Sequence, residues 1–377
     1  MSLPVPFNDL SRIHQPLIQS LKEAISGVIE SNAYIQGPEV SAFEGEFAAY
    51  CQTAHAIGVS SGTDALLAAL MALDIGKGDE VITTPFTFFA TAGVIHRLGA
   101  TPVFADIEEE SFNIDPEAVG KCITANTKAI IAVHLFGRMA DMRRLNEIAS
   151  EYSIPLIEDA AQSVGAEYED GRRAGSIGRI GCFSFFPAKN LGGFGDGGCI
   201  TTQDDVLAKR MRALRVHGAE KKYHHDMVGG NFRLDALQAA ILRVKLKALE
   251  EWTEDRISLA QNMRNALAKY DETPALRLPK SPVGRHVYNQ FVIRSCFRDD
   301  ILADLKNERI GTAIYYPKSL HQQPCFAHLG YQPGDFPISE KACTEVLALP
   351  NFPGMKDMES QRVAEVLSQS LKRLLNQ

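Results

Sequence analysis

The sequence predicts an α/β protein with a mainly parallel sheet of seven strands, flanked by helices and followed by a smaller α+β unit. Between about residues 55 and 205, short apolar runs alternate with stretches of helical periodicity. Such runs are typical of strands that are buried on both faces of a parallel sheet. After residue 272 the pattern changes to proline-rich turns and a short strand–helix–strand series. We therefore expect a large domain at residues 1–250 and a small domain at residues 251–377.

Seven apolar runs are candidate strands, and three amphipathic stretches between them are candidate helices. The strands are expected at 55–59, 79–84, 101–106, 129–136, 154–159, 181–186 and 198–202. The helices are expected at 63–73, 88–99 and 142–152. Because parallel α/β sheets bind their ligands at the carboxyl ends of the strands, we expect the chemistry in the residues that follow each run.

The second half of the chain begins with a helical segment at 233–270 that is too long for an ordinary globular helix. We expect it to bend and to bridge the two domains. The proline-rich stretch 273–286 predicts a linker, 287–295 predicts a strand, and 298–317 predicts a helix followed by a second strand.

Composition restricts the class of protein. The chain has 377 residues, of which 45% are hydrophobic and 23% are charged, enough apolar residues for sizeable cores. A formal net charge of −7 argues against a nucleic-acid-binding protein. No apolar run reaches the roughly 18 residues of a membrane helix, and the first residues do not resemble a secretion signal. Seven scattered cysteines without a C-x-x-C motif fit reduced thiols, so we expect a cytoplasmic protein without a metal site.

Small residues follow the first predicted strand and lead directly into a helix. They are Ser60, Ser61, Gly62 and Thr63. Free backbone N–H groups and the positive end of the helix dipole make such a turn a site for a phosphate group. A plain helix cap needs only one of these residues and explains the pattern equally well. The residues alone leave both interpretations open.

Two carboxylates, Glu158 and Asp159, stand at the end of the fifth predicted strand. At least one of them is expected in a poorly solvated place, where a carboxylate requires a cationic or hydrogen-bonding partner. The alternative is an ordinary cap of the next helix. Gln162, about one helical turn further on, can reach the same ligand.

Lys189 lies between the sixth predicted strand and a run of glycines, and strand alternation places Ser184 on the side that could face a ligand. A Walker A loop is excluded because Asn190 follows the lysine. A lone loop lysine is usually a solvated surface charge. However, a phosphate site, a carboxylate and an amine at neighbouring strand ends are together what pyridoxal 5'-phosphate requires. Near such groups a lysine has a lowered pKa and can act as a nucleophile and base.

Ordered motifs along nearly the whole chain point to one family. They include "SSGTDAL" (60–66), "IEDAAQSVGA" (157–166), "CFSFFPAKNLGGFGDGG" (182–198), "GGNFRLDALQAAIL" (229–242) and "YYPKSLHQQP" (315–324). On these motifs the sequence resembles the sugar aminotransferases of the DegT/DnrJ/EryC1/StrS group. The resemblance implies the fold type I of pyridoxal-phosphate-dependent transferases.

The resemblance also implies roles for individual residues. Lys189 would form the Schiff base with the cofactor and Asp159 would pair with its ring nitrogen, as the two catalytic residues. The other implied cofactor contacts are Gly62, Thr63 and Ser184 at the phosphate, Phe88 over the ring, Gln162 at the ring hydroxyl, and Asn231. Asn231 would reach the phosphate of a neighbouring subunit, which implies a homodimer with shared active sites; from the residues alone it is a turn residue. The implied substrate contacts are Arg233, Tyr315, Tyr316 and His321.

The function that the resemblance implies is transfer of an amino group from L-glutamate to a keto sugar linked to a nucleoside diphosphate. The pattern at 217–242 is most similar to enzymes that act at C3, on UDP-3-keto-glucuronates or dTDP-3-keto-6-deoxyhexoses. Amination at C4 is the alternative substrate hypothesis. A regulatory or structural protein that binds the cofactor without turnover, and a lyase or dehydratase, are the alternatives of other classes. Lys189 favours transamination over the dehydratases of this group, which carry histidine at that position.

Overall fold

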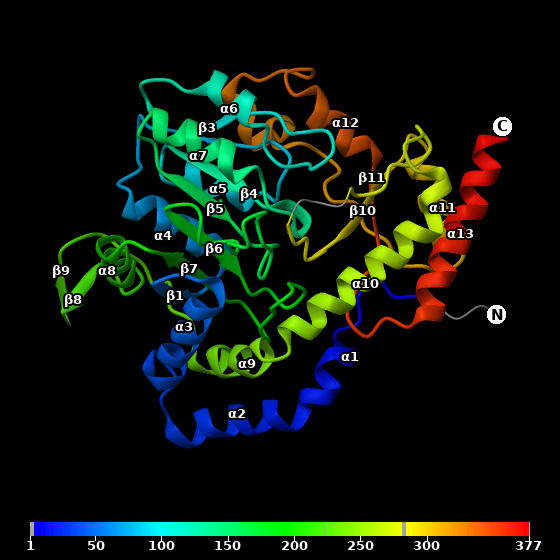
Figure 1. Cartoon of the computed structure of the whole chain (residues 1–377). Coiled ribbons are helices and arrows are strands. Elements are labelled where there is room, and N and C mark those ends of the chain that lie inside the picture. The colour runs from blue at the N-terminus through cyan, green and yellow to red at the C-terminus, as the bar shows by residue number, and fades with distance from the viewer. Residues whose placement is uncertain (1–3, 222, 281–283, 377) are drawn as a thin grey trace.

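The computed structural model describes residues 4–221, 223–280 and 284–376, and a seven-stranded sheet lies at its centre (Figure 1). The strand order is β1-β7-β6-β5-β4-β2-β3. The strands are β1 (His55–Val59), β2 (Glu80–Thr83), β3 (Thr101–Phe104), β4 (Thr127–Val133), β5 (Leu156–Asp159), β6 (Ile180–Ser184) and β7 (Gly198–Thr202). β7 runs antiparallel to both of its neighbours, and the other pairs are parallel. The predicted, mainly parallel sheet is therefore confirmed.

Helices cover both faces of the sheet, and each face has its own hydrophobic core. One core contains residues of α4 (Gly62–Ala72), α5 (Ala90–Arg97) and α8 (Asp205–Leu214). The other contains residues of α3 (Gly37–Cys51), α7 (Met142–Glu151) and α9 (Ala236–Leu246). Successive strand residues alternate between the two cores, as Leu156 and Ile157 of β5 do. We call the two sides the α4 face and the α9 face.

The remaining elements surround this body or form the carboxyl-terminal part. The helices are α1 (Leu10–His14), α2 (Ile18–Ser31), α6 (Pro116–Cys122), α10 (Leu249–Leu267), α11 (Arg298–Asn307), α12 (Pro337–Glu345) and α13 (Asp357–Leu375). The short strands are β8 (Ala219–Lys221), β9 (His224–His225), β10 (Phe291–Arg294) and β11 (Val346–Leu349). Within the described parts of the chain, no helix combines the length and apolar character needed to cross a membrane.

The long helical segment bends as predicted, because α9 ends at Leu246 and α10 begins at Leu249. α10 leaves the sheet and runs to α11 and α13 (Figure 1). Leu249 packs in the core of the α9 face, whereas Leu259 and Met263 pack in a separate core with β10, β11, α11 and α13. The boundary expected at residues 250/251 stays a prediction, and the separate cores are consistent with it.

One predicted strand of the carboxyl-terminal part is wrong. α11 forms as expected, but the chain after it makes only isolated bridges, from Ile310 to Val5 and from Ala313 to Ala348. The reason is that residues 314–318 leave β11 and line a cavity at the main sheet instead of extending a ladder. β10 is also shorter than expected because Val287 hydrogen-bonds to the main body, through Gly137 O at 3.0 Å.

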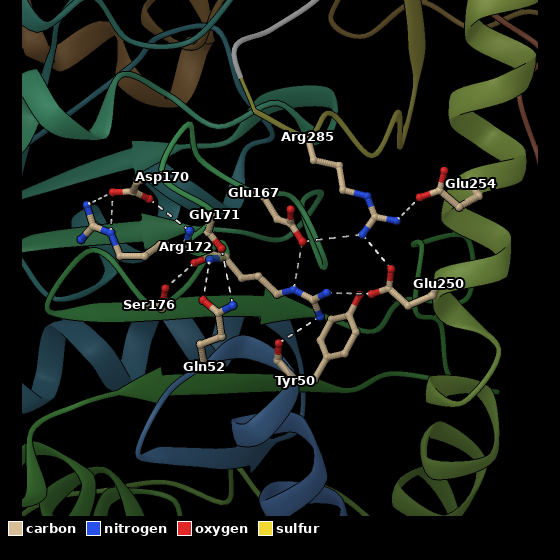
Figure 2. A network of polar contacts seen from close by, with 11 residues as sticks. Tyr50, Gln52, Glu167, Asp170, Gly171, Arg172, Ser176, Glu250, Glu254 and Arg285 are labelled. Atoms are coloured by element: carbon tan, nitrogen blue, oxygen red, sulfur yellow. Dashed lines mark hydrogen bonds and ion pairs between the residues drawn. The ribbon is translucent and has the colours of Figure 1, made fainter.

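Polar contacts join the main body to α10 and to the segment before β10 (Figure 2). Arg173 contacts Glu167 at 3.3 Å and Glu250 of α10 at 3.1 Å. Arg285 contacts the same Glu250 at 2.7 Å and Glu254 at 2.5 Å. We call these five residues the α10 network. Every charged group in it has a partner of opposite sign, so it fixes geometry without leaving a reactive charge.

Candidate active site

A cavity of about 700 Å³ opens at the carboxyl ends of the parallel strands, where the sequence predicts a ligand. Its walls come from the turn after β1, the connection from β2 to α5, the ends of β5 and β6, and residues 314–318. Nine of the twelve predicted site residues line it: Gly62, Thr63, Phe88, Asp159, Gln162, Ser184, Lys189, Tyr315 and Tyr316. The fold thus brings together residues that lie more than 250 positions apart in the chain.

The amino end of α4 forms one wall of the cavity. Ser61 caps the helix, its Oγ accepting a hydrogen bond from Asp64 N at 3.0 Å. Because the cap uses Ser61, the backbone N–H groups of Gly62 and Thr63 at the helix start remain available to a ligand. A Cβ added to Gly62 would lie 2.7 Å from Ser184 Cβ. A side chain at position 62 would clash with Ser184, so glycine lets the start of α4 pack against the end of β6. The cap at Ser61 and free N–H groups for an anion can therefore coexist at this helix start.

Glu158 lies on the α9 face of β5 and is fully enclosed. Its carboxylate accepts hydrogen bonds from His134 Nε2 at 2.8 Å and from the backbone N–H groups of Gly175, Ile177 and Gly178. Burial alone would raise the pKa of Glu158, but these hydrogen bonds bring it below its usual value. Ala140 N donates to His134 Nδ1, so the proton of His134 is on Nε2. Glu158 is therefore a structural carboxylate.

Asp159 lies on the opposite, α4 face and lines the cavity. Its Oδ2 accepts a hydrogen bond from Thr91 at 2.8 Å and its Oδ1 accepts one from Ala161 N at 3.2 Å. Burial raises the pKa of Asp159, and the hydrogen bond from Thr91 only partly opposes this effect. Asp159 is thus a buried carboxylate that lacks a close ion-pair partner among the described residues. A cationic group in the cavity would supply one.

Lys189 projects into the cavity from the irregular segment between β6 and β7. Its backbone N–H bonds to Phe186 O at 2.8 Å, and its amine makes no hydrogen bond or ion pair with any described residue. Removal from water lowers the pKa of Lys189 to about 8, although the charge of Asp159 acts in the opposite direction. Near neutral pH a useful fraction of this amine is unprotonated and can act as a nucleophile or a base.

Aromatic and amide groups complete the walls. Phe88 lines the cavity with 59% of its surface exposed, which is unusual for a phenylalanine that serves only packing. Gln162 is fixed from both ends, since its Oε1 accepts from Phe136 N at 2.6 Å and its Nε2 donates to Tyr316 at 3.2 Å. Burial raises the pKa of the Tyr316 hydroxyl, which therefore remains protonated at neutral pH.

These residues fit pyridoxal 5'-phosphate. The backbone N–H groups of Gly62 and Thr63 at the start of α4, which the Ser61 cap leaves available, match a phosphate at a helix start. The buried carboxylate of Asp159 matches a protonated ring nitrogen, and the unpaired amine of Lys189 matches an aldehyde. Each part of the cofactor thus has a chemically suited partner on the cavity wall.

Three predicted residues lie outside the cavity of this chain. Asn231 and Arg233 run beside the edge strand β1, pairing with Val216 and Val59, and Arg233 Nε is buried without a described hydrogen-bond partner. Their predicted role in a neighbouring subunit stays a prediction. His321 lies outside this lining, because its buried ring contacts Ser319 at 3.0 Å and Glu340 at 3.1 Å, and its predicted place on the sugar side stays a prediction. A short 3₁₀ turn directs His321 away while Leu320 lines the cavity.

Sequence reasoning missed four residues that matter here. Asn289, Gln290 and Lys318 line the cavity, and Thr91 of α5 holds Asp159. Lys318 lies inside the motif at 315–324, which could have signalled it. Nothing in the sequence distinguishes Thr91 from other polar helix residues. Across the described residues, no group of three or more histidine, cysteine, aspartate or glutamate side chains could hold a metal ion.

Known proteins resemble the chain over almost its full length. It is 47% identical to the "Pleiotropic regulatory protein" of Geobacillus stearothermophilus, covering 97% of this chain and 98% of that protein. It is 42% identical to the UDP-2-acetamido-2-deoxy-3-oxo-D-glucuronate aminotransferase of Pseudomonas aeruginosa, covering 93% and 95%. The crystal structure of S. venezuelae DesV in complex with a ketimine intermediate superposes with a TM-score of 0.94 at 41% identity, covering 98% and 99%.

The fold and the site define a pyridoxal-phosphate-dependent aminotransferase. The solved structures that match the chain are aminotransferases as well. The model of the DegT/DnrJ/EryC1/StrS aminotransferase family matches residues 17–368, and the chain belongs to this family. The predicted family, fold type and cofactor are thereby confirmed.

Proposed function

We propose that this enzyme transfers the amino group of L-glutamate to the C3 keto group of a sugar linked to a nucleoside diphosphate. The observation that carries the proposal is one cavity that contains an unpaired amine at Lys189, a buried carboxylate at Asp159 and a helix start at Gly62. Support for C3 comes from the Pseudomonas aeruginosa relative, whose substrate is a UDP-linked 3-oxo sugar. The size of the cavity, about 700 Å³, suits a cofactor together with part of such a substrate.

The cofactor would be held at three points. Lys189 would anchor it covalently through Nζ, Asp159 would face its ring nitrogen, and the start of α4 with Ser184 would bind its phosphate. Phe88 would pack on its ring, and Gln162 would contact its ring hydroxyl. When bound, pyridoxal phosphate supplies an electron sink that stabilises negative charge at the carbon next to the transferred nitrogen.

Lys189 would carry the proton transfers. With a pKa lowered to about 8, its amine takes a proton from the α-carbon of glutamate in the first half of the reaction. In the second half it returns a proton to C3 of the sugar. Asp159, whose Oδ2 accepts a hydrogen bond from Thr91, would face the ring nitrogen of the cofactor and favour its protonated form. Burial of Asp159, which is 5% exposed, strengthens its electrostatic interaction with a cationic group in the cavity.

The substrate would enter past Tyr315 and Tyr316. We also propose a cytoplasmic homodimer in which Asn231 and Arg233 act in the cavity of the partner subunit. This placement is supported by their position beside the edge strand β1, outside the lining of their own cavity. It would give the buried Arg233 Nε, which lacks a described partner, an anionic group to bind.

The test of this function is spectroscopic and chemical. The purified holoenzyme should be yellow, and L-glutamate alone should shift its visible band to that of the aminated cofactor. A panel of UDP- and dTDP-linked amino sugars, run in reverse with 2-oxoglutarate, should single out 3-amino sugars by NMR of the products. Selective turnover of 4-amino sugars would support amination at C4 instead. A coloured protein indifferent to glutamate would support a lyase or a regulatory protein.

The role of Lys189 has its own test, with Lys247 at the exposed end of α9 as the matched control. Borohydride reduction of the holoenzyme followed by peptide mapping should place the cofactor on Lys189. Lys189→Ala should abolish this label and turnover, while Lys247→Ala should retain both. A label on any other side chain would overturn the assignment.

A further inference from the structure

The segment that carries Lys189 has no regular secondary structure, and it is rich in glycine. We call residues 189–197 the lysine loop; Gly192, Gly193, Gly195 and Gly197 lie in it. Glycine backbones have many accessible conformations, so a loop of this composition does not hold its own shape. The position of Lys189 therefore depends on the groups that hold the lysine loop from outside.

Two side chains of α9 hold the lysine loop from the α9 face of the sheet. Lys245 Nζ donates a hydrogen bond to Gly192 O. Gln238 Oε1 accepts a hydrogen bond from Phe194 N at 2.8 Å. Residues seven positions apart lie on the same face of a helix, so both anchors point to one side of α9. A Cβ added to Gly193 would lie 2.7 Å from Gln238 Oε1, so the loop rests directly on this helix.

Two asparagines fix the residue next to Lys189. Asn190 Nδ2 donates to Val287 O at 3.1 Å, and Asn289 Nδ2 donates to Asn190 Oδ1 at 2.7 Å. The stretch from Gly192 to Phe194 lies beyond this contact and is tied down by α9. Backbone hydrogen bonds from Gly193 N to Phe185 O, at 2.7 Å, and from Phe185 N to Gly197 O, at 2.8 Å, tie the loop to the end of β6. The α9 anchors are the side-chain attachments of the same stretch, on its other side.

Lys245 is in an unusual setting for a lysine. It is only 1% exposed and forms no ion pair with a described carboxylate. Besides Gly192 O, its amine lies 3.1 Å from His14 Nε2 and faces the rings of Phe194, at 5.5 Å, and Trp252, at 5.9 Å. Burial, and then the charge of Lys245, lowers the pKa of His14 to about 4, so its neutral ring accepts a hydrogen bond from the amine.

Such a lysine is unfavourable for folding. Burial of an ammonium group without a carboxylate disfavours the charged form, and burial accordingly lowers the pKa of Lys245 to about 8. A methionine of similar length would fill the same space without this penalty. The presence of an amine here is explained by what it holds rather than by a gain in stability.

We propose that Lys245 and Gln238 are positioning residues for Lys189: they clamp the lysine loop onto α9 and so keep the amine of Lys189 directed into the cavity beside Asp159. This inference rests on the proposed role of Lys189 as the point of cofactor attachment. Neither residue lines the cavity. Their effect on the reaction is transmitted through the backbone from Gly192 to Phe194.

The first test measures the loop itself, in apoenzyme, by hydrogen–deuterium exchange of peptides spanning 185–198. Loss of a hydrogen bond from a charged donor should speed exchange of the loop amides by about tenfold in Lys245→Met. Gln238→Leu should likewise speed exchange of the Phe194 amide. This second variant keeps the test valid if Lys245→Met does not fold. Lys247→Met is the matched control and should leave the loop unchanged. Wild-type exchange in folded Lys245→Met or in Gln238→Leu would overturn the proposal.

The second test separates positioning from general support of the fold. Lys245→Met should keep or raise the melting temperature of the apoenzyme while it weakens cofactor retention and lowers kcat by about tenfold, with KM for the keto sugar little changed. Gln238→Glu, which retains the acceptor for Phe194 N, should restore loop exchange and kcat relative to Gln238→Leu. Parallel losses of melting temperature and kcat without rescue would indicate only structural support. A borohydride label away from Lys189 would refute the proposed function and leave the exchange result intact.

Discussion

The two faces of β5 carry adjacent carboxylates whose pKa values shift in opposite directions. On the α9 face, Glu158 accepts four hydrogen bonds, including one from His134, and its pKa is lowered. On the α4 face, Asp159 accepts two, and its pKa is raised by burial. Both side chains are removed from water, so burial alone does not separate them. The number of donors separates a carboxylate that supports the fold from one that is left for chemistry.

The largest expected effect tests the α4 face. Asp159→Asn keeps the shape and the hydrogen bond from Thr91 but removes the charge opposite a protonated ring nitrogen. We expect kcat/KM to fall about 10³-fold, as for loss of a preorganised electrostatic contact. The apoenzyme should be at least as stable as the wild type, because a buried charge with a raised pKa is removed. Steady-state kinetics and thermal melting check both parts; near-normal kcat/KM would contradict the assigned role.

The second effect concerns Lys189, whose pKa is lowered from 10.5 to about 8. Below pH 8 the amine is mostly protonated, and above it mostly free. In apoenzyme at pH 8, an amine reagent should therefore modify Lys189 about 100 times faster than the lysine of a short model peptide, after correction for exposure. Mass spectrometry of labelled peptides from pH 6 to 11 gives both midpoints. Equal midpoints would show that the cavity does not perturb the amine.

A smaller effect is expected on the α9 face. Glu158→Gln places an amide among three backbone donors and His134, which all require an acceptor oxygen, and this should reduce the free energy of unfolding by about 2 kcal/mol. Activity per folded molecule should change little. Because the pKa of Glu158 is lower in the folded state, its contribution to the free energy of unfolding is present above about pH 4.5. This contribution is lost as the pH falls. Urea unfolding at pH 7 and pH 4 measures it. A variant as stable as the wild type would contradict the comparison.

The smallest effect is expected in the α10 network, where charges are paired but partly exposed. Glu254→Gln removes one contact of Arg285 and should cost about 0.5 kcal/mol or less. High salt should reduce even this difference, because screening weakens the wild-type pair. Melting at low and high salt tests the prediction. A large, salt-independent loss would mean that the α10 network is closer to a buried cluster.

The sequence predicted the sheet well for a physical reason. Its strands are short apolar runs, and several parallel strands end next to residues that line the cavity, as β5 ends at Asp159. Lys189 and Gly62 could be predicted because pyridoxal phosphate has an aldehyde, a ring nitrogen and a phosphate. Each of these groups requires a different kind of residue, and each kind can be recognised at a strand end. The role of Thr91 could not be predicted, because it depends on how α5 packs against β5. The orientation of the His321 ring could not be predicted either, because a short 3₁₀ turn sets it and hydrophobic periodicity does not encode that turn.

The chain has a single tryptophan, and it lies where the buried amine of α9 faces its ring. Intrinsic emission from this protein therefore comes from one known position, 8% exposed, next to the anchor of the lysine loop. Trp252 is a built-in optical probe, so loosening of that anchor can be followed by fluorescence without attaching any dye.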